Sequence, residues 1–200
     1  MRIGTVAGGQ ADTAARVQSF DAADYDALCD FIAAVVRAGC QVAIVHARKA
    51  VLGGWSPKEN RDVPPLRYDV VWRLRGDFPD LPLVVNGGVR RAQDAVAMLA
   101  HCDGVMLGRE AYHRPMVLAE IDRMLHPDAG TPPVTVEAVL ARMADYAERE
   151  LAQGERLHSI TRHMLGLVTH SAGAREFRRR LSEGARARDA GADVIRHALD

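Results

Sequence analysis

The chain has 200 residues, of which 48% are hydrophobic and 26% charged, and its 26 basic and 26 acidic side chains give a formal net charge of zero. These values exclude wholesale disorder and a uniformly basic nucleic-acid coat, and no apolar run approaches the roughly 18 residues that a membrane span needs. Three scattered cysteines and the lack of an N-terminal apolar signal segment predict a soluble, cytoplasmic chain with reduced thiols and no metal site.

The first half of the chain alternates between helical and strand patterns. Ser19 is predicted to cap a helix over Asp21–Ala38 that ends before Gly39. One apolar stripe on this helix combines residues at helical spacing: Leu28, Phe31, Ile32, Val35 and Val36. Apolar strands are predicted over residues 42–45, 83–85 and 104–107, and further helices over residues 68–75 and 91–101. Strands without polar alternation are typical of a parallel sheet covered on both faces, so this half is predicted to be a βαβ series.

From about Pro115 onward the pattern is helical only. Helices are predicted over residues 134–151, 156–168, 174–181 and 189–199. The stretch rich in Pro and Gly at residues 126–133 predicts a boundary. We therefore expect an α/β domain over residues 1–126 and an all-helical domain over residues 134–200.

The α/β part offers three clear strands and a possible fourth at Arg2–Gly4. A closed (β/α)₈ barrel has eight strands and typically about 250 residues. The strand count therefore leaves two interpretations, a small open sheet or the second half of a barrel.

Two glycine-containing segments follow successive strands and are candidates for binding phosphate. Asn86-Gly87-Gly88 comes after one strand, and Gly108-Arg109 comes after the next. The loops after the last two strands of a (β/α)₈ barrel commonly bind phosphate, because glycine lets backbone N–H groups approach the oxygens and an arginine adds a bidentate donor. The alternative for Asn-Gly is a hairpin turn, which the helical pattern after Val89 disfavours.

Three further polar residues lie after the strand over residues 42–45. His46 follows this strand directly and could hydrogen-bond a cofactor or simply end the strand. Lys58 and Arg61 lie three positions apart in a polar loop, where they could reach one anion together or serve as plain surface charge.

The balanced overall charge conceals a basic segment. Between Arg156 and Arg188 eight arginines stand against Glu176 and Glu183, which gives this segment a net charge of +6. A local basic patch on a neutral protein favours one face that binds a polyanion. The alternative is a solvated helical face whose carboxylate partners lie elsewhere in the fold.

Several longer motifs run along nearly the whole chain in order. They are His46-Ala47-Arg48-Lys49-Ala50, Ser56-Pro57-Lys58-Glu59-Asn60-Arg61, Pro64-Pro65-Leu66, Asn86-Gly87-Gly88, the segment Asp103–Tyr112, the segment Thr161–Leu167, and Gly173-Ala174-Arg175. Together they resemble the tRNA-dihydrouridine synthases, and among them the A subfamily.

The resemblance implies a fold, a reaction and a set of site residues. The fold would be the C-terminal half of a TIM (β/α)₈ barrel followed by an all-helical tRNA-binding domain. Enzymes of this family use NADPH to reduce FMN, and the flavin passes hydride to C6 of a uridine in the tRNA D-loop, at positions 20 and 20a in the A subfamily. The resemblance assigns the FMN to His46, Asn86, Gly87, Gly88, Gly108 and Arg109. It assigns the tRNA to Lys58, Arg61, Arg175 and Arg178.

The sequence also departs from the family pattern. The Asn-x-Gly-Cys-Pro segment, whose cysteine protonates C5 in the family, does not occur in it, and none of Cys29, Cys40 and Cys102 has that context. No catalytic residue is therefore assigned, and we expect the chain to be an incomplete synthase. Two alternatives are a non-catalytic remnant that only binds RNA and another FMN-dependent TIM-barrel oxidoreductase, of the dihydroorotate-dehydrogenase kind. The sequence leaves open the oligomeric state and the choice between positions 20 and 20a.

Overall fold

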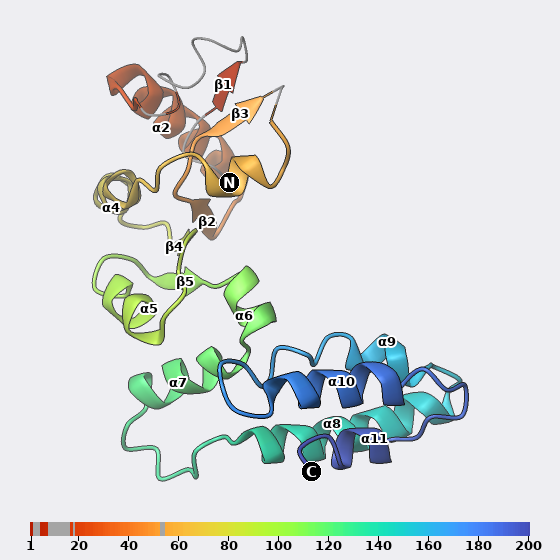
Figure 1. Ribbon diagram of the computed structural model, residues 1–200. Helices are drawn as coiled ribbons and strands as arrows, with labels where there is room; N and C mark the ends of the chain where they lie inside the picture. Colours follow the sequence, from red (N-terminus) through yellow and green to blue (C-terminus); the bar gives the residue numbers. More distant parts are fainter. Residues whose placement is uncertain (2–4, 8–16, 18, 53–54) are drawn as a thin grey trace. The chain divides into compact units, whose positions relative to one another are not determined.

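A computed structural model describes residues 1, 5–7, 17, 19–52 and 55–200. The described residues form two compact units, Met1–Gly108 and Arg109–Asp200 (Figure 1). The described strands all belong to the first unit, and the second unit is helical. The Pro- and Gly-rich stretch at residues 126–133 lies inside the second unit, so the helical unit begins before it. None of the helices in the described part of the chain has the length and apolar character needed to cross a membrane.

The first unit contains a parallel three-stranded sheet in the order β2-β4-β5. Its strands are β2 (Ala43–His46), β4 (Leu83–Asn86) and β5 (Gly104–Met106). The predicted strands are thus confirmed within one residue at each end, and the parallel pairing excludes a hairpin after Asn86. The backbone of Met1 continues the sheet beside β2, because the Met1 amino group donates to the Ile44 carbonyl and the His46 N–H donates to the Met1 carbonyl, each at 2.6 Å. The strand predicted at Arg2–Gly4 lies outside the described residues.

Helices cover one face of this sheet. They are α2 (Ala22–Arg37), α4 (Tyr68–Asp77) and α5 (Ala92–Met98). The core between α2, α4 and the sheet consists mainly of buried apolar side chains: Leu28, Ile32, Val45, Val71, Leu74, Leu83 and Val85. Along β2 the burial alternates, with Ala43 and Val45 buried and Ile44 45% exposed. The expected cover on both faces is therefore seen on only one face within the described residues.

The helix α2 differs in two details from the prediction. Its N-cap is Asp21 rather than Ser19, because Asp21 and Asp24 accept hydrogen bonds from each other's backbone N–H in a reciprocal capping box. Its buried face is Tyr25, Leu28 and Ile32, whereas Phe31 is 52% exposed. Tyr25 was missed because its hydroxyl, which donates to Asp77 at 2.6 Å, makes a polar residue suitable for the core. Gly39, with φ of 97°, ends the helix as predicted.

Three short elements of the first unit were not predicted. The strands β1 (Thr5–Ala7) and β3 (Ala50–Leu52) form a second, two-stranded parallel sheet. The one-turn helix α3 (Glu59–Asp62) follows β3. Elements of three or four residues are too short to show a hydrophobic period.

The second unit contains six helices. They are α6 (Arg109–His113), α7 (Met116–Leu125), α8 (Val136–Ala152), α9 (Leu157–Thr161), α10 (Ala174–Gly184) and α11 (Asp193–Arg196). The core side chains include Leu140, Ala144, Ala147, Leu157, Phe177, Leu181 and Ile195. The Thr135 side chain caps α8 by accepting from the Ala138 N–H at 3.2 Å.

The helices α9 and α11 are shorter than the predicted helices over residues 156–168 and 189–199. After Thr161 the chain continues as turns, and Gly166 passes so close to the His113 carbonyl that a β-carbon at this position would collide with it. This close approach requires glycine at position 166, which the apolar spacing of the segment does not reveal. In α11 the helix starts only after Gly191.

Candidate functional site

The carboxyl end of the parallel sheet brings two of the predicted cofactor residues together. His46 ends β2 and Asn86 ends β4, and the two residues are direct partners in the register of the sheet. Asn86 is in turn the partner of Met106, whose carbonyl accepts a hydrogen bond from the Asn86 Nδ2 at 2.9 Å. The row from His46 through Asn86 to Met106 therefore lies on the end of the sheet where α/β proteins bind ligands.

Two glycines turn the chain away from this row. Gly87 has φ of 119° and Gly88 has φ of 72°, conformations that side chains with a β-carbon rarely adopt. A β-carbon on Gly87 would lie 3.0 Å from the His46 imidazole, and one on Gly88 would collide with the Leu66 side chain. Both the backbone angles and the packing therefore require glycine, and the absence of side chains leaves the backbone of the turn accessible at Gly88, which is exposed.

The turn is held from the side by Tyr68. Its hydroxyl donates to the Gly87 carbonyl at 2.5 Å, and its ring stacks on Trp72 with centroids 5.9 Å apart. Burial raises the pKa of the Tyr68 hydroxyl, so this group keeps its proton as a donor. Sequence reasoning missed Tyr68 as part of the site. The only signal was its place two residues after Pro64-Pro65-Leu66.

The segment after β5 contains the other predicted phosphate residues. Gly108 is exposed, and a β-carbon there would meet no atom within 4 Å, so packing does not require this glycine as it does Gly87 and Gly88. Arg109 follows in the chain as the first residue of α6 and is exposed. It belongs to the second unit, and its role at a phosphate stays a prediction.

The loop with Lys58 and Arg61 is built by its other polar residues. Ser56 and Glu59 bond reciprocally, with Ser56 N–H to Glu59 Oε2 at 2.7 Å and Glu59 N–H to Ser56 Oγ at 3.2 Å. These bonds lower the pKa of Glu59. The buried Asn60 side chain bonds both backbone groups of Val51, accepting from N–H at 2.7 Å and donating to C=O at 3.0 Å. Lys58 and Arg61 are left exposed at this fixed turn, as an anion-binding pair requires.

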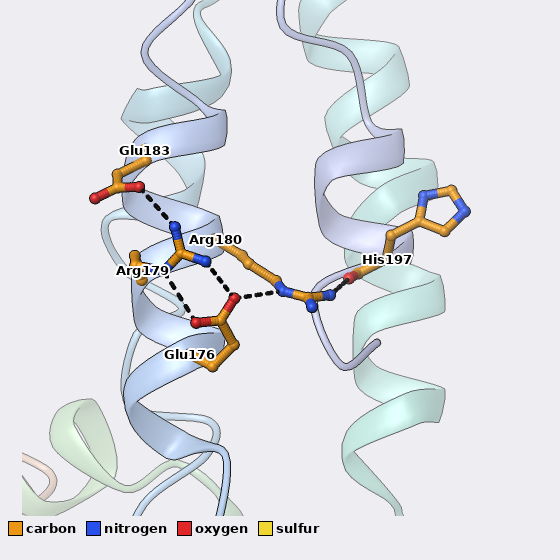
Figure 2. Close-up of polar contacts among 5 residues, drawn as sticks. All are labelled: Glu176, Arg179, Arg180, Glu183 and His197. Carbon is orange, nitrogen blue, oxygen red and sulfur yellow. Dashed lines mark hydrogen bonds and ion pairs between the residues drawn. The ribbon is translucent and has the colours of Figure 1, made fainter.

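The predicted RNA residues of the helical unit lie on α10. Ala174, Phe177 and Leu181 are its buried face, and Arg175 and Arg178 are both exposed beside that face. Two further arginines of α10, Arg179 and Arg180, instead bond the Glu176 carboxylate (Figure 2). The structure thus divides the arginines of this helix, and the spacing agrees, because Arg179 and Arg180 lie three and four positions after Glu176, as in helical ion pairs.

The three cysteines lie away from the His46–Asn86–Met106 row. Cys102 is buried just before β5, at the opposite end of the sheet, and its Sγ donates to the carbonyls of Met98 and Gly104 at 3.1 Å each. Burial raises the pKa of the Cys102 thiol and that of Cys29 in α2. Cys40 precedes β2 and donates to the Val42 carbonyl. Within the part of the chain that the structure describes, no cysteine is placed as a proton donor at the candidate site.

The chain matches the family model described as dihydrouridine synthase over residues 14–200. It belongs to the dihydrouridine synthase family. The family assignment made from the motifs is thereby confirmed, and the α/β character with a parallel sheet agrees with it.

Curated relatives in this family are about 50% identical to the chain over the aligned residues. The tRNA-dihydrouridine(20/20a) synthase of Escherichia coli strain K12 is 49% identical over 185 residues, which are 92% of this chain and 53% of that protein. The protein of the same name from Vibrio cholerae is 46% identical over 185 residues, covering 92% and 56%. That from Pseudomonas syringae is 51% identical over 158 residues, covering 79% and 47%. The chain thus spans about half the length of the curated relatives that it matches.

Proposed function

We propose that this chain supplies the flavin-binding sheet edge and the tRNA-binding surface of a tRNA-dihydrouridine synthase, an oxidoreductase that uses FMN and NADPH. The reaction would be the reduction of uridine to 5,6-dihydrouridine at positions 20 and 20a of tRNA, the activity in the names of relatives such as the E. coli protein. The observation that carries the proposal is the joining of His46 and Asn86 at one sheet end, next to a turn that only glycine can make.

The first unit would contain the last four strands of a (β/α)₈ barrel, and the helical unit would be the RNA-binding domain. These correspond to the domains predicted from the sequence over residues 1–126 and 134–200. The parallel order β2-β4-β5 with Met1 beside β2 supports this, since barrel strands follow one another in sequence order. The exposed residues Ile44 and Met106 point away from the helix-covered face, which is the inward direction of a barrel strand.

The residues at the sheet end fit the FMN. The exposed backbone of Gly88 can approach a phosphate because no side chain blocks it, and Gly108 and Arg109 follow the next strand. His46 and Asn86 would orient polar atoms of the cofactor from the neighbouring row positions. When bound, FMN supplies the hydride for C6 of the uridine. The chain's own contribution is to bind and orient: Tyr68 holds the glycine turn, and the Asn86 amide is fixed by the Met106 carbonyl.

Cationic side chains on both units would hold the tRNA. Lys58 and Arg61 project from the turn fixed by Asn60, and Arg175 and Arg178 are exposed on α10. Contacts of this kind with phosphates fix the register of an RNA without reading its sequence. A uridine inside a folded tRNA has to be splayed out before it can react, so register decides which uridine reaches the flavin.

A second candidate is an RNA-binding protein without catalysis. It is favoured by the positions of Cys29, Cys40 and Cys102, all away from the sheet end. Protonation at C5 by a positioned acid is typically worth about 10²–10⁴-fold in rate. Flavin binding separates the two candidates, because an RNA-binding protein has no need of FMN.

The test combines binding with turnover on the 200-residue chain. FMN fluorescence and tRNA filter binding are measured first, and the chain is then incubated with FMN, NADPH and unmodified tRNA before mass spectrometry of the nucleosides. We expect both ligands to bind, with a dihydrouridine yield about 10²–10⁴-fold below that of the E. coli relative because the cysteine segment is absent. tRNA binding without FMN binding would favour the second candidate, and failure to bind either would refute both.

A further inference from the structure

Helix α10 presents four arginines within six residues, and the structure divides them into two pairs. Arg175 and Arg178 share one exposed strip, being three positions apart. Arg179 and Arg180 follow directly, and both guanidinium groups bond the same carboxylate, that of Glu176 (Figure 2).

The bonds to Glu176 are short and partly bidentate. Arg179 Nη2 lies 2.6 Å from Glu176 Oε1, and its Nε lies 2.9 Å from Oε2. Arg180 Nε reaches the same Oε1 at 2.9 Å, and its Nη1 donates to the His197 carbonyl after α11 at 3.1 Å. One carboxylate thus engages two guanidinium groups, and Arg180 is additionally tied to a neighbouring segment of the unit.

Glu183 adds a weaker contact to the same cluster. Its Oε2 lies 3.2 Å from Arg179 Nη1, one turn along the helix. Hydrogen bonds from Arg179 and Arg180 lower the pKa of Glu176 to about 2, so this carboxylate is ionised throughout the physiological range. Bidentate and networked pairs of this kind hold more firmly than isolated surface pairs.

Arg175 and Arg178 differ from this pair in their contacts. Within the described residues neither Arg175 nor Arg178 forms an ion pair with an acidic side chain, and Arg178 makes only a 3.4 Å contact to the Val168 carbonyl. A phosphate can therefore bind Arg175 and Arg178 directly. To bind Arg179 or Arg180 it has to displace Glu176, and it meets that negative charge as it approaches.

We propose that Glu176 confines RNA phosphate binding on α10 to Arg175 and Arg178 by engaging Arg179 and Arg180 internally. The inference rests on the proposed function, since it requires that α10 binds tRNA. Its consequence is selectivity: a larger open cluster of four arginines would bind any polyanion, whereas a two-arginine strip binds strongly only when the rest of a folded tRNA makes its own contacts.

The test measures binding of poly(U) and of tRNA across a salt series for the full chain and for Glu176→Gln. The substitution keeps the side-chain length and removes its charge. We expect the poly(U) slope of log affinity against log salt to steepen by about 0.7 for each arginine released, with affinity at 0.1 M salt rising about fivefold per arginine. tRNA affinity should rise less, so that the ratio of tRNA to poly(U) affinity falls.

Glu183→Gln is the matched control, because it changes the net charge by the same amount but leaves both Glu176 contacts in place. A second variant, Arg179→Ala with Arg180→Ala, is made in the Glu176→Gln background, where it should cancel the gain in poly(U) affinity. Circular dichroism on each variant verifies that the helices are retained.

The outcomes distinguish the inference from the function on which it rests. The inference is overturned if Glu176→Gln and Glu183→Gln change poly(U) binding equally, or if the Arg179/Arg180 double substitution leaves the gain of Glu176→Gln intact. Loss of RNA binding on removal of Arg175 and Arg178 would still support the proposed function in that case. If removal of Arg175 and Arg178 has no effect, the RNA role of α10 and the inference fail together.

Discussion

The two units present their candidate sites in different physical ways. At the sheet edge of the first unit, the backbone is shaped by packing: Gly87 and Gly88 adopt positive φ, and Leu66 and His46 occupy the space that side chains would need. On α10 of the second unit, ordinary helical backbone displays arginines, and the pairing with Glu176 decides which of them are available. Ligand binding at the first site should therefore be sensitive to the size of the side chains around the glycine turn. Binding at the second site should be sensitive to side-chain charge and to salt concentration.

The largest effect is expected at the glycine turn. Gly88→Ala puts a β-carbon at φ of 72° and against the Leu66 side chain, which should lower the free energy of unfolding by about 1–3 kcal/mol and weaken FMN binding. Urea unfolding and an FMN titration measure the two effects. The matched control is Gly76→Ala in α4, where a β-carbon meets no atom within 4 Å and stability should rise by about 0.5–1 kcal/mol. Equal effects of the two substitutions would contradict the steric account.

Charge reversal on α10 should have the next largest effect, and this effect should be confined to RNA binding. Arg175→Glu or Arg178→Glu removes a phosphate contact and adds repulsion, so tRNA affinity at 0.1 M salt should fall by about fivefold or more and the salt slope by about 0.7–0.9. FMN binding should stay as in the parent chain. Filter binding across a salt series measures this. A parent-like slope in both variants would mean that these arginines are only a solvated face.

A smaller effect is expected at the loop after β3. Lys58→Ala and Arg61→Ala should each weaken tRNA binding by up to about fivefold through the loss of one phosphate contact, with the unfolding free energy unchanged because both side chains are exposed. Asn60→Ala in the same loop should instead lower stability by about 1–3 kcal/mol, because the N–H and C=O of buried Val51 lose their partner. If Lys58→Ala destabilises the chain as much as Asn60→Ala does, the division between anchoring and binding residues is wrong.

The smallest effect is a pH dependence in the helical unit. The pKa of Glu176 is lowered from 4.5 to about 2 in the folded chain, first by the hydrogen bond from Arg179. Because the folded pKa lies below the unfolded one, this group contributes stability above about pH 4.5 that is lost as the pH falls toward 2. Thermal unfolding between pH 2 and pH 6 should show this loss, and Glu176→Gln should flatten the profile in that window. A variant with the parent profile would show that the Glu176 cluster does not stabilise the fold.

The sequence predicted the repeating parts of the fold and missed the parts fixed by single contacts. The strands at residues 42–45, 83–85 and 104–107 were predictable because each is a run of apolar residues, and the helix that begins at Tyr68 was predictable because its apolar residues recur at helical spacing. The end of α9 at Thr161 was not, because the apolar spacing continues beyond it, and the approach of Gly166 to the His113 carbonyl joins segments distant in sequence.

The candidate site shows the same limit. His46 and Asn86 could be predicted because each directly follows an apolar strand, and parallel strands place such residues side by side. The support from Tyr68 to the Gly87 carbonyl could not be predicted, whereas the pairing of Glu176 with Arg179 and Arg180 follows the helical i,i+3 and i,i+4 spacing. Residue types and spacings reveal pairs within one helix, but contacts between elements, such as that of Arg180 with the His197 carbonyl after α11, depend on the tertiary fold.

The central claim is that one chain carries a flavin site set by shape and a separate RNA site set by charge. The most direct measurement titrates FMN and tRNA against the same preparations of the parent chain, Gly88→Ala and the double variant Arg175→Glu with Arg178→Glu. We expect Gly88→Ala to lose FMN affinity and to keep the parent salt slope for tRNA. We expect the arginine variant to have a lower salt slope for tRNA and to keep the FMN affinity of the parent chain. Two results would contradict the claim of separate flavin and RNA sites. One is a variant that no longer binds either ligand although its helices stay folded, and the other is a parent chain that binds tRNA but no FMN.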